Sequence, residues 1–190
     1  MRHVVLYIPG LGDHYDDGRS FLLKGWRLWG IKTRLIPIKW YDKGSYQDKL
    51  ALVRAAIKTA KKQGYLVTLI GESAGASLAL NAAGELPGDI EKVIVIAGVN
   101  SSQLPLSPQY KALAPAFVES AKRVSRAIET INRTKIHTVR ALRDSVVSPR
   151  YNDIPNAHRH VIPTIGHFTV IILCLSILSG FITWLVRRKD

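Results

Sequence analysis

Short apolar runs alternate along the whole chain with segments whose apolar residues recur at helical spacing. Residues 65–70 form a continuous run of strand length, which is typical of a strand buried on both faces of a parallel sheet. The regular alternation of strands and helices predicts an α/β fold, a three-layer α/β/α sandwich with a mostly parallel sheet of about six strands. The predicted strands are residues 2–8, 31–38, 65–70, 90–97, 135–142 and 158–165.

Five segments have the helical spacing that the crossovers of such a sheet require. The predicted helices are residues 20–29, 45–62, 73–85, the stretch from Pro115 to Ile131, and residues 168–186. In the first of them the apolar residues fall on one face, which is the pattern of a helix that packs on a core. That face consists of Phe21, Leu22, Gly25, Leu28 and Trp29.

Composition excludes several classes of protein. The chain of 190 residues is 47% apolar and 22% charged, so neither a disordered nor a fibrous protein is expected. A single cysteine, Cys174, excludes an intramolecular disulfide and fits a reducing compartment. The net charge of +13 favours acidic neighbours, but no basic stripe is interleaved with aromatics, so no nucleic acid is expected as a partner. The first apolar stretch is too short for a secretory signal, and we expect a location on the cytoplasmic side.

The segment Gly71-Glu72-Ser73-Ala74-Gly75 lies between a predicted buried strand and an Ala-rich helix. A sharp strand-to-helix turn needs small residues around its apex, because a Cβ there would collide with neighbouring backbone. Such a turn lifts Ser73 above the edge of the sheet and points a helix N-terminus at developing negative charge. The alternative is an ordinary tight turn with a capping serine.

With this motif the chain resembles the α/β-hydrolase superfamily over nearly its whole length. Asp144 follows the penultimate predicted strand and Gly166-His167 follows the last, where the superfamily carries its acid and its histidine. The resemblance implies a catalytic triad of Ser73, Asp144 and His167, with Asp153 as a rival for the acid. The chain departs from the family pattern in having six predicted strands rather than eight and in lacking a large cap domain.

The resemblance also implies an oxyanion hole. The loop Pro9-Gly10-Leu11-Gly12 ends the first predicted strand where the family places its oxyanion loop. The backbone N–H groups of Leu11 and Ala74 are therefore the expected donors to an oxyanion. The residues expected to line the substrate are Gly10, Gly12, His14 and Glu72.

The implied reaction is acyl transfer to water through an acyl-Ser73 intermediate, on an ester, a thioester or a related acyl bond. The alternative is a catalytically inert α/β-hydrolase-like binding module associated with a membrane, since a fold does not guarantee its usual chemistry. The cluster Asp13-His14-Tyr15-Asp16-Asp17 matches no metal-binding spacing. We interpret it as a solvated loop, and expect neither a metal nor a cofactor.

Residues 168–186 contain no charge and are followed by a basic tail at 187–190. A helix of this length, at about 1.5 Å per residue, approaches the roughly 30 Å hydrocarbon core of a bilayer. It is expected either as a membrane anchor that follows a hydrolase domain of residues 1–167, or as the last core helix on the sheet. We favour the membrane, because an ordinary surface helix would carry several charges. His167 would then lie at the membrane surface, which favours lipid-like acyl substrates.

Overall fold

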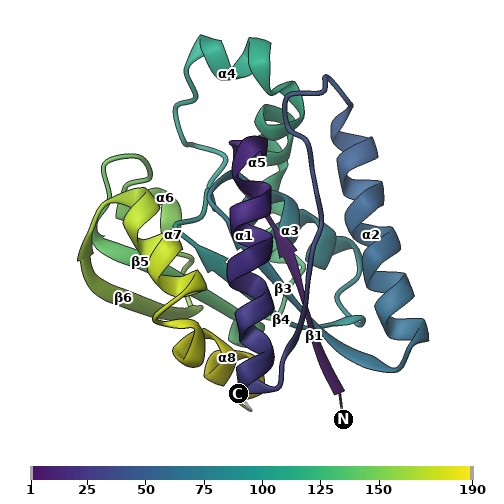
Figure 1. Ribbon diagram of the computed structural model, residues 1–190. Helices are drawn as coiled ribbons and strands as arrows, with labels where there is room; N and C mark the ends of the chain where they lie inside the picture. The colour runs from purple at the N-terminus through teal and green to yellow at the C-terminus, as the bar shows by residue number, and fades with distance from the viewer. Residues whose placement is uncertain (1, 189–190) are drawn as a thin grey trace.

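The computed structural model describes residues 2–188 and contains a six-stranded parallel sheet (Figure 1). The strands are β1 (Arg2–Ile8), β2 (Lys32–Leu35), β3 (Tyr65–Glu72), β4 (Ile90–Ile96), β5 (Ile136–Arg143) and β6 (His158–Ile165). They lie in the order β2-β1-β3-β4-β5-β6, and every neighbouring pair is parallel. The prediction of an α/β fold with a parallel sheet of six strands is confirmed.

Helices cover both faces of the sheet. They are α1 (Asp16–Lys24), α2 (Tyr46–Lys62), α3 (Ala74–Glu85), α4 (Pro108–Leu113), α5 (Pro115–Glu129), α6 (Pro149–Asn152), α7 (His167–Leu175) and α8 (Ser179–Arg187), with 3₁₀ turns η1 (Asp13–Tyr15), η2 (Gly25–Trp29) and η3 (Arg133–Lys135). One buried apolar cluster joins the sheet to α2, α3 and α5. A second cluster on the opposite face joins it to α1, η2, α7 and α8. The two clusters make the three layers of the sandwich.

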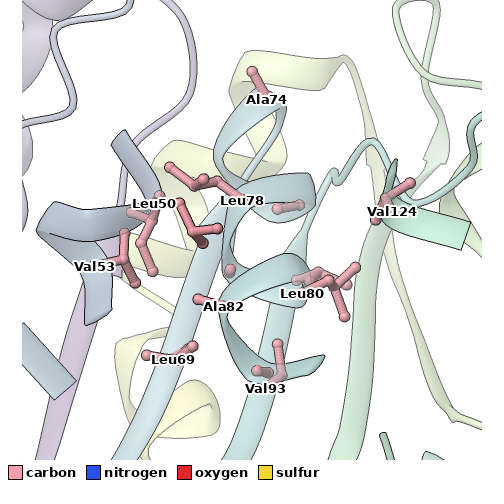
Figure 2. Close-up of a cluster of buried hydrophobic side chains, with 14 of the residues drawn as sticks. Leu50, Val53, Leu69, Ala74, Leu78, Leu80, Ala82, Val93 and Val124 are labelled. Atoms are coloured by element: carbon pink, nitrogen blue, oxygen red, sulfur yellow. The ribbon is translucent and has the colours of Figure 1, made fainter. Parts of the chain in front are cut away.

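Helix α3 lies against the centre of the sheet because its buried side chains are small or branched aliphatic. Leu78 and Leu80 of α3 pack with Leu69 of β3 and Val93 of β4 in a fully buried cluster (Figure 2). Burial of this kind stabilises the fold by about 25 cal/mol for each Å² of apolar surface removed from water. Since α3 begins directly after Ser73, the packing also determines where that residue lies.

The helix predicted at residues 20–29 is present, but its predicted core face is wrong. The structure turns Leu23 and Trp26 toward the sheet, whereas Phe21 is 73% exposed and Leu28 is 89% exposed. The chain forms α1 from Asp16 and η2 after Lys24, and the buried residues Arg19, Leu23 and Trp26 also recur at spacings of four and three, so a second face of the segment has helical periodicity. The indole N–H of Trp26 donates to the Leu175 carbonyl at 3.0 Å, which locks this orientation.

The single helix predicted at residues 168–186 is also wrong, because the segment forms two helices. Helices α7 and α8 meet at an angle of 71°, and within residues 2–188 no single helix is long and apolar enough to cross a bilayer. The break follows Ser176, whose hydroxyl donates back to the Ile172 carbonyl at 2.6 Å. Val170, Cys174 and Ile182 of the pair are fully buried in the second cluster. Lys189 and Asp190 of the predicted basic tail lie outside the described residues.

Candidate active site

Ser73 occupies the apex of the turn between β3 and α3, with φ 47° and ψ −117°. This conformation is strained for a residue with a side chain, and it persists only where the surroundings hold it. The Ser73 N–H donates to the Ile96 carbonyl at 2.9 Å, and its carbonyl accepts from the Val99 N–H at 3.0 Å. Gly75 allows the close approach of β1, since a Cβ there would lie 2.2 Å from the Ile8 carbonyl oxygen. The turn therefore presents the hydroxyl in one direction.

The buried imidazole of His167 contacts side chains from two distant parts of the chain. Its Nε2 lies 2.9 Å from Oγ of Ser73, and its Nδ1 lies 2.8 Å from Oδ2 of Asp144. The three residues follow β3, β6 and β5, and the carboxyl ends of parallel strands meet at one edge of the sheet. The structure thus brings the three predicted triad residues together in the order hydroxyl, imidazole, carboxylate.

Asp144 is held as an ionised acceptor. Its Oδ1 accepts hydrogen bonds from the backbone N–H groups of Val146 (2.8 Å) and Val147 (3.0 Å). Burial alone would raise the pKa of Asp144, but the hydrogen bonds from the imidazole and the two amides outweigh burial, so the pKa is lowered from 3.8. A depressed pKa means that the carboxylate stabilises the fold above pH 3.8 and loses this effect only as the pH falls through the lower folded value.

Asp153, the rival acid, has other partners. Its carboxylate accepts from Arg140 at 3.0 Å and from Arg159 at 3.5 Å. Three further histidines are also engaged away from Ser73, because the ring of His137 stacks on His158 and His160 within the sheet. Among the acids that follow β5, the structure therefore places Asp144 and not Asp153 against the imidazole of His167.

The loop at Gly10–Gly12 lies against the serine turn. A Cβ on Gly10 would lie 2.9 Å from Cβ of Ser73, and Gly12 adopts a φ of 95°, which favours glycine. Within residues 2–188, the N–H groups of Leu11 and Ala74 donate to no protein acceptor. Both are the predicted oxyanion donors, and both amides are free to bind a ligand oxygen.

Solved structures with a similar fold match nearly the whole chain. A structure described with the metagenome-derived lipolytic enzymes LipS and LipT has a TM-score of 0.74 at 15% identity, over 98% of this chain and 94% of that one. A Paleococcus ferrophilus monoacylglycerol lipase has a TM-score of 0.69 at 12% identity, over 96% and 93%. MGS-MChE2, an alpha/beta hydrolase enzyme from a lagoon-sediment metagenome, has a TM-score of 0.62 at 16% identity, over 96% and 90%.

The chain has the α/β-hydrolase fold. No protein-family model matches its sequence, and no match was found among the curated proteins. In this α/β-hydrolase fold the connection between β4 and α5 contains only the short helix α4, as expected for a chain without a large cap domain.

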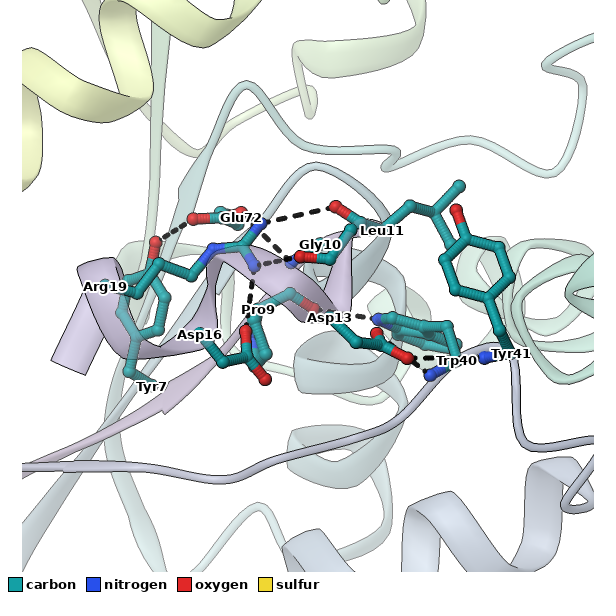
Figure 3. A network of polar contacts seen from close by, with 11 residues as sticks. Tyr7, Pro9, Gly10, Leu11, Asp13, Asp16, Arg19, Trp40, Tyr41 and Glu72 are labelled. Carbon is teal, nitrogen blue, oxygen red and sulfur yellow. Dashed lines mark hydrogen bonds and ion pairs between the residues drawn. The ribbon is translucent and has the colours of Figure 1, made fainter.

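A buried polar network lies beside the loop at Gly10–Gly12 of this α/β-hydrolase fold (Figure 3). The carboxylate of Glu72 accepts from the Tyr7 hydroxyl, from the Arg19 guanidinium, and from the Gly10 N–H at 3.2 Å. Arg19 also donates to the carbonyls of Gly12 (2.8 Å) and Leu11 (3.3 Å). Because the carbonyls of Leu11 and Gly12 turn toward Arg19, the network fixes the orientation of the peptide groups of this loop.

The network corrects one prediction and adds two residues that the sequence analysis missed. Glu72 was expected to line the substrate, but it is 1% exposed and its carboxylate is occupied by the three donors. Tyr7 and Arg19 were not predicted, although a tyrosine within the aliphatic strand β1 was a visible signal of a buried polar partner. Burial and the Glu72 charge raise the pKa of Tyr7, which keeps its hydroxyl a donor.

The remaining predictions for this region stay open. His14 is exposed, and its ring centroid lies 3.9 Å from that of Tyr15, so its role in lining the substrate remains a prediction. In the part of the chain that the structure describes, no group of three His, Cys, Asp or Glu side chains could hold a metal ion. The absence of a metal or a cofactor from the reaction likewise remains a prediction.

Glu72→Gln is expected to lower the free energy of unfolding by about 3 kcal/mol, because removing one partner leaves the Arg19 guanidinium buried without its counter-charge. Urea denaturation measures the effect. Glu119→Gln is the matched control, since Glu119 forms an exposed ion pair with Arg123 and its loss should cost less than about 1 kcal/mol. Equal effects of the two substitutions would contradict a structural role for Glu72.

Proposed function

We propose that this protein is a serine hydrolase that cleaves an ester or a related acyl bond through an acyl-Ser73 intermediate. The observation that carries the proposal is the unbroken contact from the Ser73 hydroxyl through His167 to Asp144. Two of the similar structures are described as lipolytic enzymes and as a monoacylglycerol lipase. These descriptions support a carboxylic ester as the bond that is cleaved.

The hydrogen bonds of Asp144 determine which imidazole nitrogen can act as a base. Since Oδ1 accepts from two backbone amides, Oδ2 is left to accept the Nδ1–H of His167. With its proton on Nδ1, the imidazole directs the Nε2 lone pair at the Ser73 hydroxyl. Ser73 Oγ then attacks the acyl carbon while Nε2 takes the proton and later delivers it to the leaving oxygen. A water molecule then attacks the acyl carbon in the same way, with Nε2 of His167 as the base, and the acid is released from Ser73.

The free amides of Leu11 and Ala74 supply the electrostatic part of the proposed mechanism. The attack on the acyl carbon transfers negative charge to the carbonyl oxygen, and two preorganised N–H donors stabilise that charge more than they stabilise the substrate. Removing one such donor costs about 3 kcal/mol of transition-state stabilisation. The Arg19–Glu72 network supports this step by holding the two peptide groups on either side of the one that carries the Leu11 N–H.

A fluorophosphonate probe tests the proposal directly. We expect the wild-type protein to be labelled at Ser73, because the activated oxygen displaces fluoride from phosphorus and forms a stable bond. Ser73→Ala should not be labelled, whereas Ser20→Ala, which removes a hydroxyl on α1, should be labelled like the wild type. Mass spectrometry of the labelled peptide locates the adduct.

The same experiment distinguishes the alternative of an inert binding module. A wild-type protein that is folded by circular dichroism but unlabelled would contradict the proposed hydrolase. Labelling that survives in Ser73→Ala would show that another residue is the nucleophile, which would equally contradict the proposed role of Ser73.

A further inference from the structure

The outer surface of the layer formed by α1, η2, α7 and α8 is apolar. Solvent-facing helices ordinarily carry charges, yet Leu28 is 89% exposed and Ile177 is 80% exposed. We call this surface the apolar face. Its large exposed side chains are Phe21, Leu28, Trp29, Phe168, Ile172, Ile177 and Trp184. Exposed apolar patches of this kind mark sites of interaction.

The four elements form one continuous layer. Helix α1 contacts α7, and η2 contacts α8, so the elements lie side by side on one face of the sheet (Figure 1). Trp29 joins them, because its indole N–H donates to the Ser179 hydroxyl at 3.1 Å and its ring packs closely on Gly180, where a Cβ would lie 3.1 Å from it. Residues far apart in the sequence therefore contribute to the same surface.

Charge around the apolar face is predominantly positive. The first turn of α1 carries Asp16 and Asp17, but residues 18–41 and 154–188, which contain the rest of this layer and both edge strands, include nine lysines and arginines and no aspartate or glutamate. Lys24 and Arg27 are exposed on α1 and η2, and Arg187 is exposed at the end of α8. The opposite helical layer is mixed, with exposed ion pairs such as Arg54–Glu85. The excess of positive charge thus lies beside the apolar residues.

We propose that the apolar face docks the folded protein onto an anionic lipid membrane. Exposed aromatic and aliphatic side chains would enter the region between headgroups and acyl chains, and the flanking cations would attract the lipid phosphates. A second copy of the chain is disfavoured as the occupant, because two faces that both carry an excess of positive charge repel each other. The docking is peripheral, since the inner sides of α7 and α8 fill the core and cannot leave the sheet.

Docking would place the candidate active site at the membrane boundary. Phe168 is exposed and directly follows His167, and the two rings contact edge to face with centroids 5.5 Å apart. On the proposed hydrolase function, this neighbourhood makes acyl esters of membrane lipids the substrate class. The docking itself does not depend on catalysis.

Vesicle sedimentation with the full chain tests the inference. We expect the wild type to bind vesicles of phosphatidylcholine and phosphatidylglycerol in equal parts about tenfold or more strongly than vesicles of phosphatidylcholine alone, and added salt to weaken this binding. Leu28→Ser combined with Ile177→Ser should weaken binding by about tenfold or more. Leu52→Ser is the matched control, because Leu52 is 47% exposed on α2 in the opposite layer.

Substitutions of the exposed cations beside the apolar face form a second test, which has its own control variant. Lys24→Gln and Arg27→Gln should each weaken binding to the anionic vesicles by about fivefold, whereas Lys58→Gln on α2 should leave it unchanged. All of these side chains are exposed, so circular dichroism should report unaltered folding.

Three results would overturn the inference. The first is equal binding to neutral and anionic vesicles. The second is a Leu28/Ile177 variant that binds like the wild type. The third is self-association that this variant abolishes, which would assign the face to a second copy. Fluorophosphonate labelling tests the proposed hydrolase function separately. Loss of vesicle binding is expected to leave labelling in solution intact, and loss of labelling is expected to leave vesicle binding intact.

Discussion

Asp144→Asn is expected to lower kcat by about 10⁴-fold with little change in KM, because it imposes the wrong imidazole tautomer. The two backbone amides that donate to Oδ1 would keep the oxygen of the new amide and turn its NH₂ group toward Nδ1 of His167. Nδ1 must then accept, so the proton moves to Nε2. An Nε2–H donates to Ser73 and cannot take its proton.

Hydrolysis of p-nitrophenyl butyrate, together with the rate of fluorophosphonate labelling, measures this loss. Asp153→Asn is the control, because it removes the rival carboxylate, which pairs with Arg140, and should leave kcat close to the wild-type value. Nearly full activity in Asp144→Asn, or a comparable loss in Asp153→Asn, would show that the acid had been assigned to the wrong residue.

Gly75→Ala is expected to prevent the native fold, with a loss of more than about 4 kcal/mol of unfolding free energy. The new Cβ would lie 2.2 Å from the Ile8 carbonyl oxygen and 2.6 Å from that of Pro9. Both contacts are with backbone, so no side-chain rotation can relieve them. Either α3 moves away from β1, which empties the centre of the core, or the chain remains unfolded.

Gly18→Ala is the matched control for this substitution. Gly18 lies within α1 and has φ in the ordinary range, and a Cβ there meets no atom within 4 Å. Replacing such a helical glycine should raise stability by about 0.5–1 kcal/mol. Thermal and urea unfolding followed by circular dichroism measure both variants. A Gly75→Ala protein as stable as the wild type would mean that β1 and the serine turn are not in close contact.

The arrangement of the candidate site could be predicted because it depends on chain order. Small residues around Ser73 require a sharp turn, and Asp144 and His167 follow strands whose ends meet at one edge of a parallel sheet. The alternation of apolar runs with helical segments by itself indicates that sheet. The catalytic roles of these residues stay predictions, which the labelling and kinetic experiments test.

The details that escaped prediction depend on contacts between elements. The face of α1 and η2 was misassigned because two faces of the segment have helical spacing, and contacts such as the bond from Trp26 to Leu175 determine which of them packs on the core. The break after Ser176 was missed because no proline or glycine marks it. The position of Glu72 was wrong because its two main partners, Tyr7 and Arg19, are 65 and 53 residues away. The location on the cytoplasmic side stays a prediction.

His167 stands 94 residues after Ser73, beyond the last strand of the sheet. A chain emerging from the ribosome therefore carries its candidate nucleophile long before it carries the group that could activate it. Only a chain that has folded as far as His167 unites the two, so on the proposed function a chain that ends before His167 has an ordinary, unreactive hydroxyl. On that function, reaction with a serine-directed probe would report that the chain has folded past His167.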